Sequence, residues 1–341
     1  MRRALARVMA VLVTGGAGYI GSHTVACLRS AGRDVVVIDD LSSGSPERVP
    51  SDVPIVIADV GDRHAVRDAI DAHDVDAIVH FAGRIRVGES VDDPRLYWRD
   101  NLAATVALLD AALERGVRSF VFSSSAAVYG TPSATPISES DPLAPINPYG
   151  ETKAAVERML AAYGAAYGLR WIALRYFNAA GAAHGLAEQH EPETHLVPLV
   201  LDVALGRRPH VALFGADHAT PDGTCVRDYV HVADLADAHV AALAHLARGG
   251  DSGALNLGTG VGHSVSEVIA TCREVTERDI PVVVGPRRAG DPPSLVASPS
   301  RARRVLGWSA KRSLHDIVRD AYIARSATAS PPEPKEQAHA R

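Results

Sequence analysis

The sequence predicts an α/β protein: a Rossmann-type, doubly wound parallel sheet followed by a smaller C-terminal α/β domain. Three observations support this. Short apolar runs and helical patterns alternate through the first half of the chain, an order that favours parallel strands with helices on both faces. A glycine-rich turn at residues 14–22 joins the first apolar run to the first helical pattern. An acidic residue, Asp39, ends the second apolar run.

The predicted elements follow that order along the chain. Apolar runs predict strands at 8–14, 34–39, 55–58, 77–81, 119–122, 170–176 and 254–257, and helical patterns lie at 19–30, 63–72, 96–115, 149–167 and 232–248. Residues 131–148 are rich in Pro and Ser, which predicts a long loop. From residue 181 to 228 the periodicity weakens. A capping box, Ser264 to Glu267, predicts the start of another helix.

These patterns divide the chain into four parts. We expect a flexible N-terminal extension at 1–8, a dinucleotide-binding domain at 9–180, a substrate domain at 181–326 whose elements can return to the first, and a disordered tail at 327–341. The net charge of −5 gives no electrostatic case for nucleic acid or an anionic membrane. Three widely spaced cysteines suit a reducing cytoplasm, and no apolar run is long enough to span a bilayer.

The glycine-rich turn has the spacing of a dinucleotide-binding loop. Gly15, Gly18 and Gly21 fall at i, i+3 and i+6. Such glycines permit a tight turn, a close approach of backbone to pyrophosphate, and tight packing of helix on strand. Asp39 follows about 20 residues later, where a carboxylate binds the adenosine ribose hydroxyls. Because no Arg or Lys follows Asp39 until Arg48, the sequence predicts NAD rather than NADP.

Two further segments carry candidate catalytic groups. Ser125 closes a serine run at the end of the fifth predicted strand, and Tyr149 and Lys153 lie at i and i+4 of a predicted helix. A nearby ammonium and an oxidised nicotinamide would lower the pKa of the phenol, which is near 10 when free. A phenolate, a serine hydroxyl and a lysine can together deprotonate an alcohol while hydride leaves its carbon.

Taken together, these motifs resemble the extended short-chain dehydrogenases/reductases, and more narrowly the UDP-glucose 4-epimerase family, over residues 8–309. The stretches that carry the resemblance are 14–22, 80–83, 87–90, 123–130, 175–178 and 222–232. It implies Ser125, Tyr149 and Lys153 as the catalytic set, with Tyr149 as the base. It also implies NAD contacts from Gly15, Gly18, Tyr19, Ile20, Gly21, Asp39, Asp40, Ser43, Asp59, Val60, Phe81, Ala82, Gly83, Asn101, Ser123, Tyr149, Lys153 and Phe177.

The same resemblance implies a UDP-hexose substrate, a homodimer and reversible oxidation at sugar C4 through a 4-keto intermediate. The implied substrate contacts are Ser125, Tyr149, Asn178, His195, Leu196, Ala212, Leu213, Phe214, Arg227, Arg288, Asp291 and Leu295. Arg227 and Arg288 suit the diphosphate, because guanidinium pairs bidentately with phosphate oxygens. The chain departs from the family pattern where Arg84 and Arg86 replace a frequent Lys, and where Leu295 replaces a bulky Tyr of some relatives. A smaller side chain at position 295 could admit N-acetylated sugars.

Several alternatives stay open at this stage. A nucleotide-sugar 4,6-dehydratase would need an Asp-Glu pair in place of Ser125-Ala126. A UDP-glucuronate or UDP-N-acetylglucosamine 4-epimerase would share the residues above, and a non-catalytic NAD-sensing regulator would keep only the glycine loop. The histidine- and glutamate-rich stretch 184–195, with Glu188, Glu191 and Glu193, lacks a convincing ligand spacing, so no metal is expected there.

Overall fold

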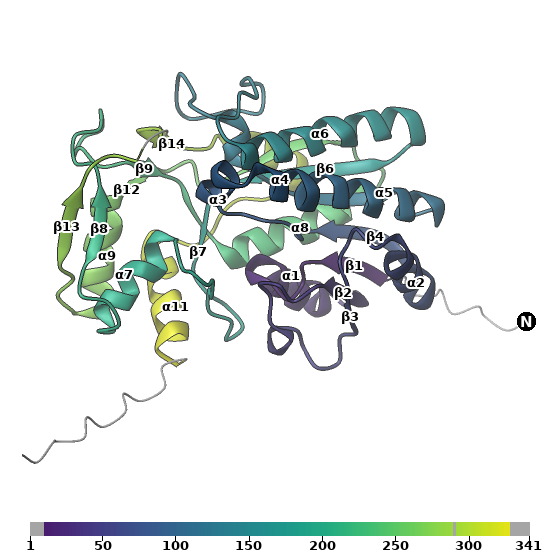
Figure 1. Cartoon of the computed structure of the whole chain (residues 1–341), viewed down its shortest axis with the longest axis horizontal. Coiled ribbons are helices and arrows are strands. Elements are labelled where there is room, and N and C mark those ends of the chain that lie inside the picture. The colour runs from purple at the N-terminus through teal and green to yellow at the C-terminus, as the bar shows by residue number, and fades with distance from the viewer. Residues whose placement is uncertain (1–9, 289–290, 328–341) are drawn as a thin grey trace, which may run out of the picture.

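The first strand, β1 (Ala10–Thr14), ends in the glycine-rich turn and leads into α1 (Tyr19–Ser30), as the sequence predicts. The structure is a computed structural model that describes residues 10–288 and 291–327 (Figure 1). The predicted extension at 1–8 lies outside the described residues, as does the predicted tail beyond Ala327. Ala327 itself is the last residue of α11 (Leu314–Ala327).

The large sheet is doubly wound and parallel. Its strands run in the order β11, β6, β5, β4, β1, β2, β3, and every pair is parallel. The bounds are β2 (Val35–Asp39), β3 (Ile55–Ile57), β4 (Val75–His80), β5 (Ser119–Ser125), β6 (Arg170–Tyr176) and β11 (Gly253–Leu257). The order reverses between β1 and β4, and ligands of such sheets bind outside the carboxyl ends of strands at this reversal. The predicted fold class is confirmed.

Helices cover both faces of this sheet, and each face has its own apolar core (Figure 1). Along β1, Val11 and Val13 point to one core while Leu12 points to the other, as the period of two in a strand requires. One face is covered by α2 (Arg63–His73), α5 (Ala104–Glu114) and α6 (Pro148–Tyr167), and the other by α1, α8 (Val232–Ala247) and α10 (Ser300–Leu306).

The predicted helix at 96–115 is not one continuous α-helix. The chain forms α3 (Val87–Asp92), α4 (Pro94–Tyr97), a π-helical segment at Trp98–Ala103, and then α5. The wider π turn places Asn101 inside the protein, where it is 3% exposed. A π turn inserted in a helix commonly marks a functional site, and a period of 3.6 in the sequence does not reveal it.

A third apolar core lies in the C-terminal part, at the left of Figure 1. It is formed by α7 (Leu196–Ala204), α9 (Val265–Thr276), α11, and the parallel pair β8 (Val211–Phe214) and β13 (Val282–Gly285). The capping box of Ser264 and Glu267 is confirmed at the start of α9. Short strands link this core to the large sheet: β7 (Asn178–Ala180), β9 (Val226–Arg227), β10 (Tyr229–His231), β12 (His263–Ser264) and β14 (Ser294–Leu295).

Residues after 180 therefore serve both parts of the molecule. β11 extends the large sheet beside β6, and α8 packs against α1, whereas α7 and α9 belong to the third core. The predicted domain boundaries stay a prediction. Among the described residues, no helix is both long and apolar enough to cross a membrane.

Candidate active site

The glycine-rich turn is built by close backbone contacts that exclude side chains. Gly15 has a φ of +67°, and a Cβ on it would lie 2.6 Å from the backbone nitrogen of Ala82, in the loop after β4. A Cβ on Gly21 would lie 2.2 Å from the carbonyl oxygen of Gly15. The first glycine thus lets two strand ends meet, and the second lets α1 pack on the turn.

The start of α1 leaves its backbone donors free for a ligand. Gly18 is the N-cap residue and supplies no side-chain cap, and the first turn contains no acidic residue. The unpaired N–H groups and the positive end of the helix dipole form an anion site that fits a pyrophosphate. Tyr19 can contribute only its backbone here, because its hydroxyl donates to the carbonyl of Gly181 at 2.6 Å. Ile20 packs toward the apolar core.

Asp39 ends β2 directly beside the glycine-rich turn. Its two carboxylate oxygens accept hydrogen bonds from the backbone nitrogens of Ala17 and Leu41, each at 2.9 Å. Burial raises its pKa, although these two hydrogen bonds act in the opposite direction. Each oxygen keeps a further acceptor site, so the carboxylate is oriented by the loop and can still accept from ribose hydroxyls.

The other predicted adenosine contacts lie at neighbouring strand ends. Asp40 binds the backbone nitrogen and hydroxyl of Ser42, while Ser43 is exposed. Asp59 follows β3 and accepts from the nitrogen of Gly61 at 2.7 Å. Val60 is buried in the core, so its side chain supports the wall of the crevice and only its backbone faces outward chemistry.

The loop after β4 forms the opposite side of the crevice. Phe81 packs against His239 with ring centroids 4.6 Å apart. Gly83 is held by Asn101, whose Oδ1 accepts from the nitrogen of Arg84 at 2.7 Å. The Asn101 amide also donates to the Arg84 carbonyl and to Thr152 of α6. Asn101 therefore fixes the loop to the helix that carries Tyr149, and its effect on a cofactor is through position.

The two cations after Gly83 are already paired. Arg84 binds Asp100 at 2.6 Å, and Arg86 donates to the carbonyl of Glu191. These contacts hold the loop after β4 against its neighbours, which leaves the helix start as the better site for the pyrophosphate.

Ser125, Tyr149 and Lys153 come together at the carboxyl end of β5. Ser125 ends the strand, and its hydroxyl accepts from the nitrogen of Ala127 at 3.1 Å and hydrogen-bonds Tyr149. Lys153 donates to the carbonyl of Ser123 at 3.0 Å, and its ammonium lies 5.8 Å from the ring centroid of Tyr149. The predicted catalytic set thus forms one contiguous group.

The start of α6 explains why Tyr149 reaches Ser125. Asn147 caps the helix by accepting from the nitrogen of Gly150 at 2.9 Å, and Pro148 takes the first helical position. A Cβ on Gly150 would lie 2.6 Å from the carbonyl of Ala127. The glycine therefore lets the helix start rest directly on the short 3-10 turn that follows β5 (Ala126–Tyr129).

Burial dominates the protonation of this group. It raises the pKa of Tyr149, although the hydrogen bond from Ser125 lowers it in part. Burial lowers the pKa of Lys153 to about 8, with the Glu157 carboxylate acting in the opposite direction. The lowered pKa expected for Tyr149 is thus wrong for the protein alone, because desolvation outweighs the ammonium. The positive charge of a bound oxidised nicotinamide has to supply the shift.

A buried polar network supports the catalytic strand and was missed from the sequence. Glu157 and Arg175 form a buried ion pair at 2.5 Å. Ser124 donates to Glu157 at 2.5 Å, and Arg175 donates to the hydroxyl of Tyr129 at 2.7 Å. Tyr129 donates in turn to Asn256 of β11. The network joins β5, α6, β6 and β11, and no local sequence pattern marks residues that meet across four elements.

The substrate side is a cavity of about 420 Å³ between the two parts of the molecule. Eight of the twelve predicted substrate residues line it: Asn178, His195, Leu196, Ala212, Phe214, Arg227, Arg288 and Asp291. Arg288 lies over the ring of Phe214, 3.9 Å from the centroid. Arg227 binds Asp291 at 3.0 Å. An aromatic ring with two guanidinium groups suits a nucleotide diphosphate.

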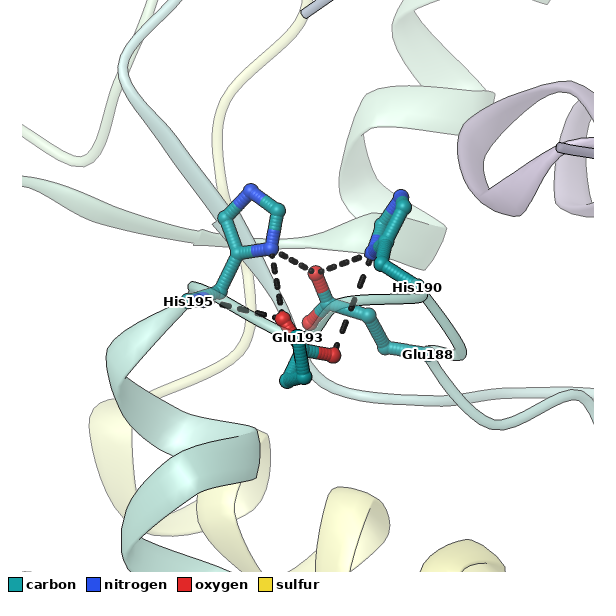
Figure 2. A group of neighbouring side chains, drawn as sticks. All are labelled: Glu188, His190, Glu193 and His195. Carbon is teal, nitrogen blue, oxygen red and sulfur yellow. Dashed lines mark hydrogen bonds and ion pairs between the residues drawn. The ribbon is translucent and has the colours of Figure 1, made fainter. Parts of the chain in front are cut away.

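Some predicted side chains lie elsewhere. Leu213 points into the third core, because alternate residues of β8 face opposite ways, so the side-chain contact predicted for it is wrong. Leu295 and Phe177 pack together against a small apolar cluster that includes Tyr129. They adjoin the catalytic strand rather than the cavity. The stretch 184–195 brings Glu188, His190, Glu193 and His195 into one group (Figure 2).

Comparison with known proteins decides the family. The sequence profile described as NAD dependent epimerase/dehydratase family matches residues 11–258. The chain belongs to this family. It is 50% identical to the UDP-glucose 4-epimerase of Halalkalibacterium halodurans over 317 residues, covering 92% of this chain and 95% of the relative.

Solved structures agree with this membership of the epimerase/dehydratase family. The UDP-glucose 4-epimerase from Brucella ovis in complex with NAD superposes with a TM-score of 0.90 at 46% identity, covering 92% of this chain and 98% of that one. The enzyme from Stenotrophomonas maltophila, with bound NAD and formylated UDP-arabinopyranose, gives 0.91 at 41% identity, covering 94% and 98%.

Proposed function

We propose that this family member interconverts UDP-glucose and UDP-galactose by inverting sugar C4, with NAD that stays bound through the cycle. The relatives described above carry this name or were crystallised with NAD and a UDP-sugar. The observation that carries the proposal is the group formed by Ser125, Tyr149 and Lys153 at the end of β5, beside the glycine crevice.

The crevice fits NAD on the evidence of its own atoms. Gly15 and Gly21 leave room that a Cβ would fill, and the uncapped start of α1 offers N–H donors to the pyrophosphate. Asp39 would hold the adenosine ribose, and Lys153 the nicotinamide ribose. When bound, NAD accepts a hydride from C4 of the sugar and gives it back.

The catalytic group moves the proton that accompanies this hydride. Tyr149 takes the proton of the sugar 4-hydroxyl, and Ser125 shares a hydrogen bond with both oxygens. The resulting 4-keto sugar turns about its diphosphate link and presents its other face. Tyr149 then returns the proton to the oxygen on C4. Arg227 and Arg288 hold the diphosphate through both halves, so the nucleotide stays fixed while the sugar moves.

Two alternatives are disfavoured by particular residues. A 4,6-dehydratase needs carboxylates where this chain has Ser125 and Ala126. A non-catalytic NAD sensor would have no use for a buried lysine fixed beside the phenol. The sugar range beyond the glucose–galactose pair, the homodimer and the cytoplasmic location stay predictions.

The test is turnover of UDP-glucose and UDP-galactose by the purified protein without added NAD, together with the absorbance spectrum of the bound cofactor. We expect interconversion to equilibrium from either sugar. A protein that carries NAD and converts neither sugar would refute the proposal, and conversion only with added NAD would refute the permanently bound cofactor.

A further inference from the structure

The loop between β7 and α7 carries a cluster that the proposed reaction does not use. Glu188, His190, Glu193 and His195 point toward one another, with both histidines presenting Nδ1 (Figure 2). Among the described residues, their four ligand atoms all lie within 4.8 Å of one another. The four residues come from one stretch of eight, whose spacing follows neither a helix nor a zinc knuckle, which is why the sequence gave no expectation of a metal.

The separations of these atoms match the edges of a coordination polyhedron. Nδ1 of His195 lies 3.0 Å from Oε1 of Glu188, and Nδ1 of His190 lies 3.4 Å from the same oxygen. Nδ1 of His190 is 3.9 Å from Oε2 of Glu193. Four ligands at zinc bond lengths around a tetrahedral ion lie about 3.3–3.6 Å apart. A small divalent ion therefore fits with shifts of a few tenths of an ångström.

The cluster is also incomplete as a set of hydrogen bonds. Nδ1 of His190 and Oε2 of Glu193 are buried without a hydrogen-bond partner in the described part of the chain. The side chains of Glu188 and Glu193 are only 5% and 9% exposed. Buried polar atoms in native proteins are nearly always satisfied, so orphaned ones point to a missing ligand. Both orphaned atoms belong to residues of the cluster.

The surroundings hold the cluster in place. The backbone nitrogens of Thr194 and His195 donate to Oε1 of Glu193, which leaves Oε2 directed at the cluster. The ring of His190 packs edge-on against Tyr19 of α1, with centroids 6.1 Å apart. Such outer contacts orient metal ligands before the metal arrives.

We propose that Glu188, His190, Glu193 and His195 bind one zinc ion per chain, as a structural site. Two imidazole nitrogens and two carboxylate oxygens suit zinc among the divalent ions, whereas Mg²⁺ and Ca²⁺ prefer oxygen alone. Four protein ligands leave no open position for chemistry. The ion ties the loop to the start of α7, and Glu188, Glu193 and His195 also line the substrate cavity. The site thus stiffens one wall of that cavity.

The experiment measures zinc on the full-length protein. Purified wild type is stripped with a chelator, reloaded with Zn²⁺ alone, passed through a desalting column and analysed by mass spectrometry for zinc per chain. His190→Phe keeps a ring against Tyr19 but removes the ligand nitrogen, and Glu193→Gln removes a charge. The matched control is Glu191→Gln, since Glu191 is an exposed carboxylate of the same loop outside the cluster.

We expect one zinc per chain in wild type and in Glu191→Gln, with Zn²⁺ raising the midpoint of thermal unfolding of both by several degrees. His190→Phe and Glu193→Gln should bind zinc at least about 100-fold more weakly, because loss of a ligand exceeds the loss of an outer contact. These variants should also lose the thermal shift while folding without zinc.

Two results would overturn the proposal. One is zinc at well below one per chain in wild type with no thermal shift. The other is equal zinc binding by wild type and both cluster variants, which would place the metal elsewhere. Circular dichroism of each variant without zinc establishes that it is folded. The inference does not depend on the proposed reaction, because neither readout involves turnover.

Discussion

The cofactor crevice and the substrate cavity are built in opposite ways. The crevice is made of backbone at the ends of neighbouring parallel strands, and its decisive residues, Gly15 and Gly21, act by having no side chain. The cavity is made of side chains from distant parts of the chain, with Arg227 on β9 and Arg288 after β13. One site is specified locally and is rigid, and the other depends on long-range packing.

This difference assigns different tasks to the two regions. The crevice holds one ligand throughout the cycle, so it gains from backbone that cannot adjust. The cavity has to hold a diphosphate firmly while its sugar turns, and guanidinium groups on separate elements can do both. Changes in the crevice or the catalytic group should therefore alter rate or cofactor content, whereas changes in the cavity should alter substrate affinity.

The largest effect is expected at the contact between the regions. Tyr149→Phe removes the proton acceptor but keeps the ring, so kcat should fall by about 10²–10⁴-fold while bound NAD is retained. Steady-state rates and cofactor content measure this. Tyr163→Phe, on the same helix, is the control and should keep its rate. Near wild-type turnover in Tyr149→Phe would exclude it as the base.

The buried network under the catalytic strand should contribute most to stability. Glu157→Gln leaves the guanidinium of Arg175 buried with an incomplete partner, which should lower the free energy of unfolding by about 3–5 kcal/mol. Ser124→Ala removes one hydrogen bond and should cost about 1 kcal/mol. Denaturant unfolding separates the two, and equal losses would show that the ion pair is not the core of the network.

In the cavity, substrate affinity should change alone. Arg227→Ala should raise KM for the UDP-sugar about 10–100-fold, since it removes charge-assisted hydrogen bonds to the diphosphate, and should leave NAD content unchanged. Arg287→Ala is the control, because that arginine pairs with Asp217 at the surface. Loss of NAD in Arg227→Ala would show that the two regions are not separable.

His80 gives the large sheet a defined pH dependence. Burial lowers its pKa to about 3, and it lies between Thr14 and Thr105. The unfolded chain, with a histidine pKa near 6.5, binds more protons between about pH 6.5 and 3, so stability falls as pH falls through that window. At pH 5 this amounts to about 2 kcal/mol. His80→Gln should show a shallower decline than wild type, and identical slopes would contradict the assignment.

The smallest effect concerns the sugar range. Leu295→Tyr should reduce turnover of UDP-N-acetylgalactosamine relative to UDP-galactose by about 10-fold, as expected when a pocket loses room for a small group. The ratio of kcat/KM values measures it. Negligible activity of wild type on the N-acetylated sugar would remove the idea.

The same contrast explains what the sequence can reveal. Gly15, Asp39 and the pair Tyr149–Lys153 lie in local patterns, so their positions follow from strand–turn–helix geometry and helix spacing. The group of Glu188, His190, Glu193 and His195 depends on an irregular loop folded against α1, and irregular backbone has no period to read. The inward direction of Leu213 likewise depends on the register of a four-residue strand that the sequence did not predict.

Desolvation is a further property that sequence does not carry. The chain order of Ser125, Tyr149 and Lys153 suggested a phenol acidified by its neighbour. Burial reverses this for the protein alone, because it raises the pKa of Tyr149 and lowers that of Lys153 to about 8. Which effect prevails depends on how completely water is excluded, and that is decided by packing between distant elements.

The central claim is that hydrogen leaves sugar C4 and returns to the same carbon without leaving the protein. UDP-galactose with deuterium at C4 tests it directly, by mass and NMR analysis of the UDP-glucose formed in ordinary water without added NAD. The account predicts deuterium retained at C4 of the product. Replacement of that deuterium by solvent hydrogen would contradict it.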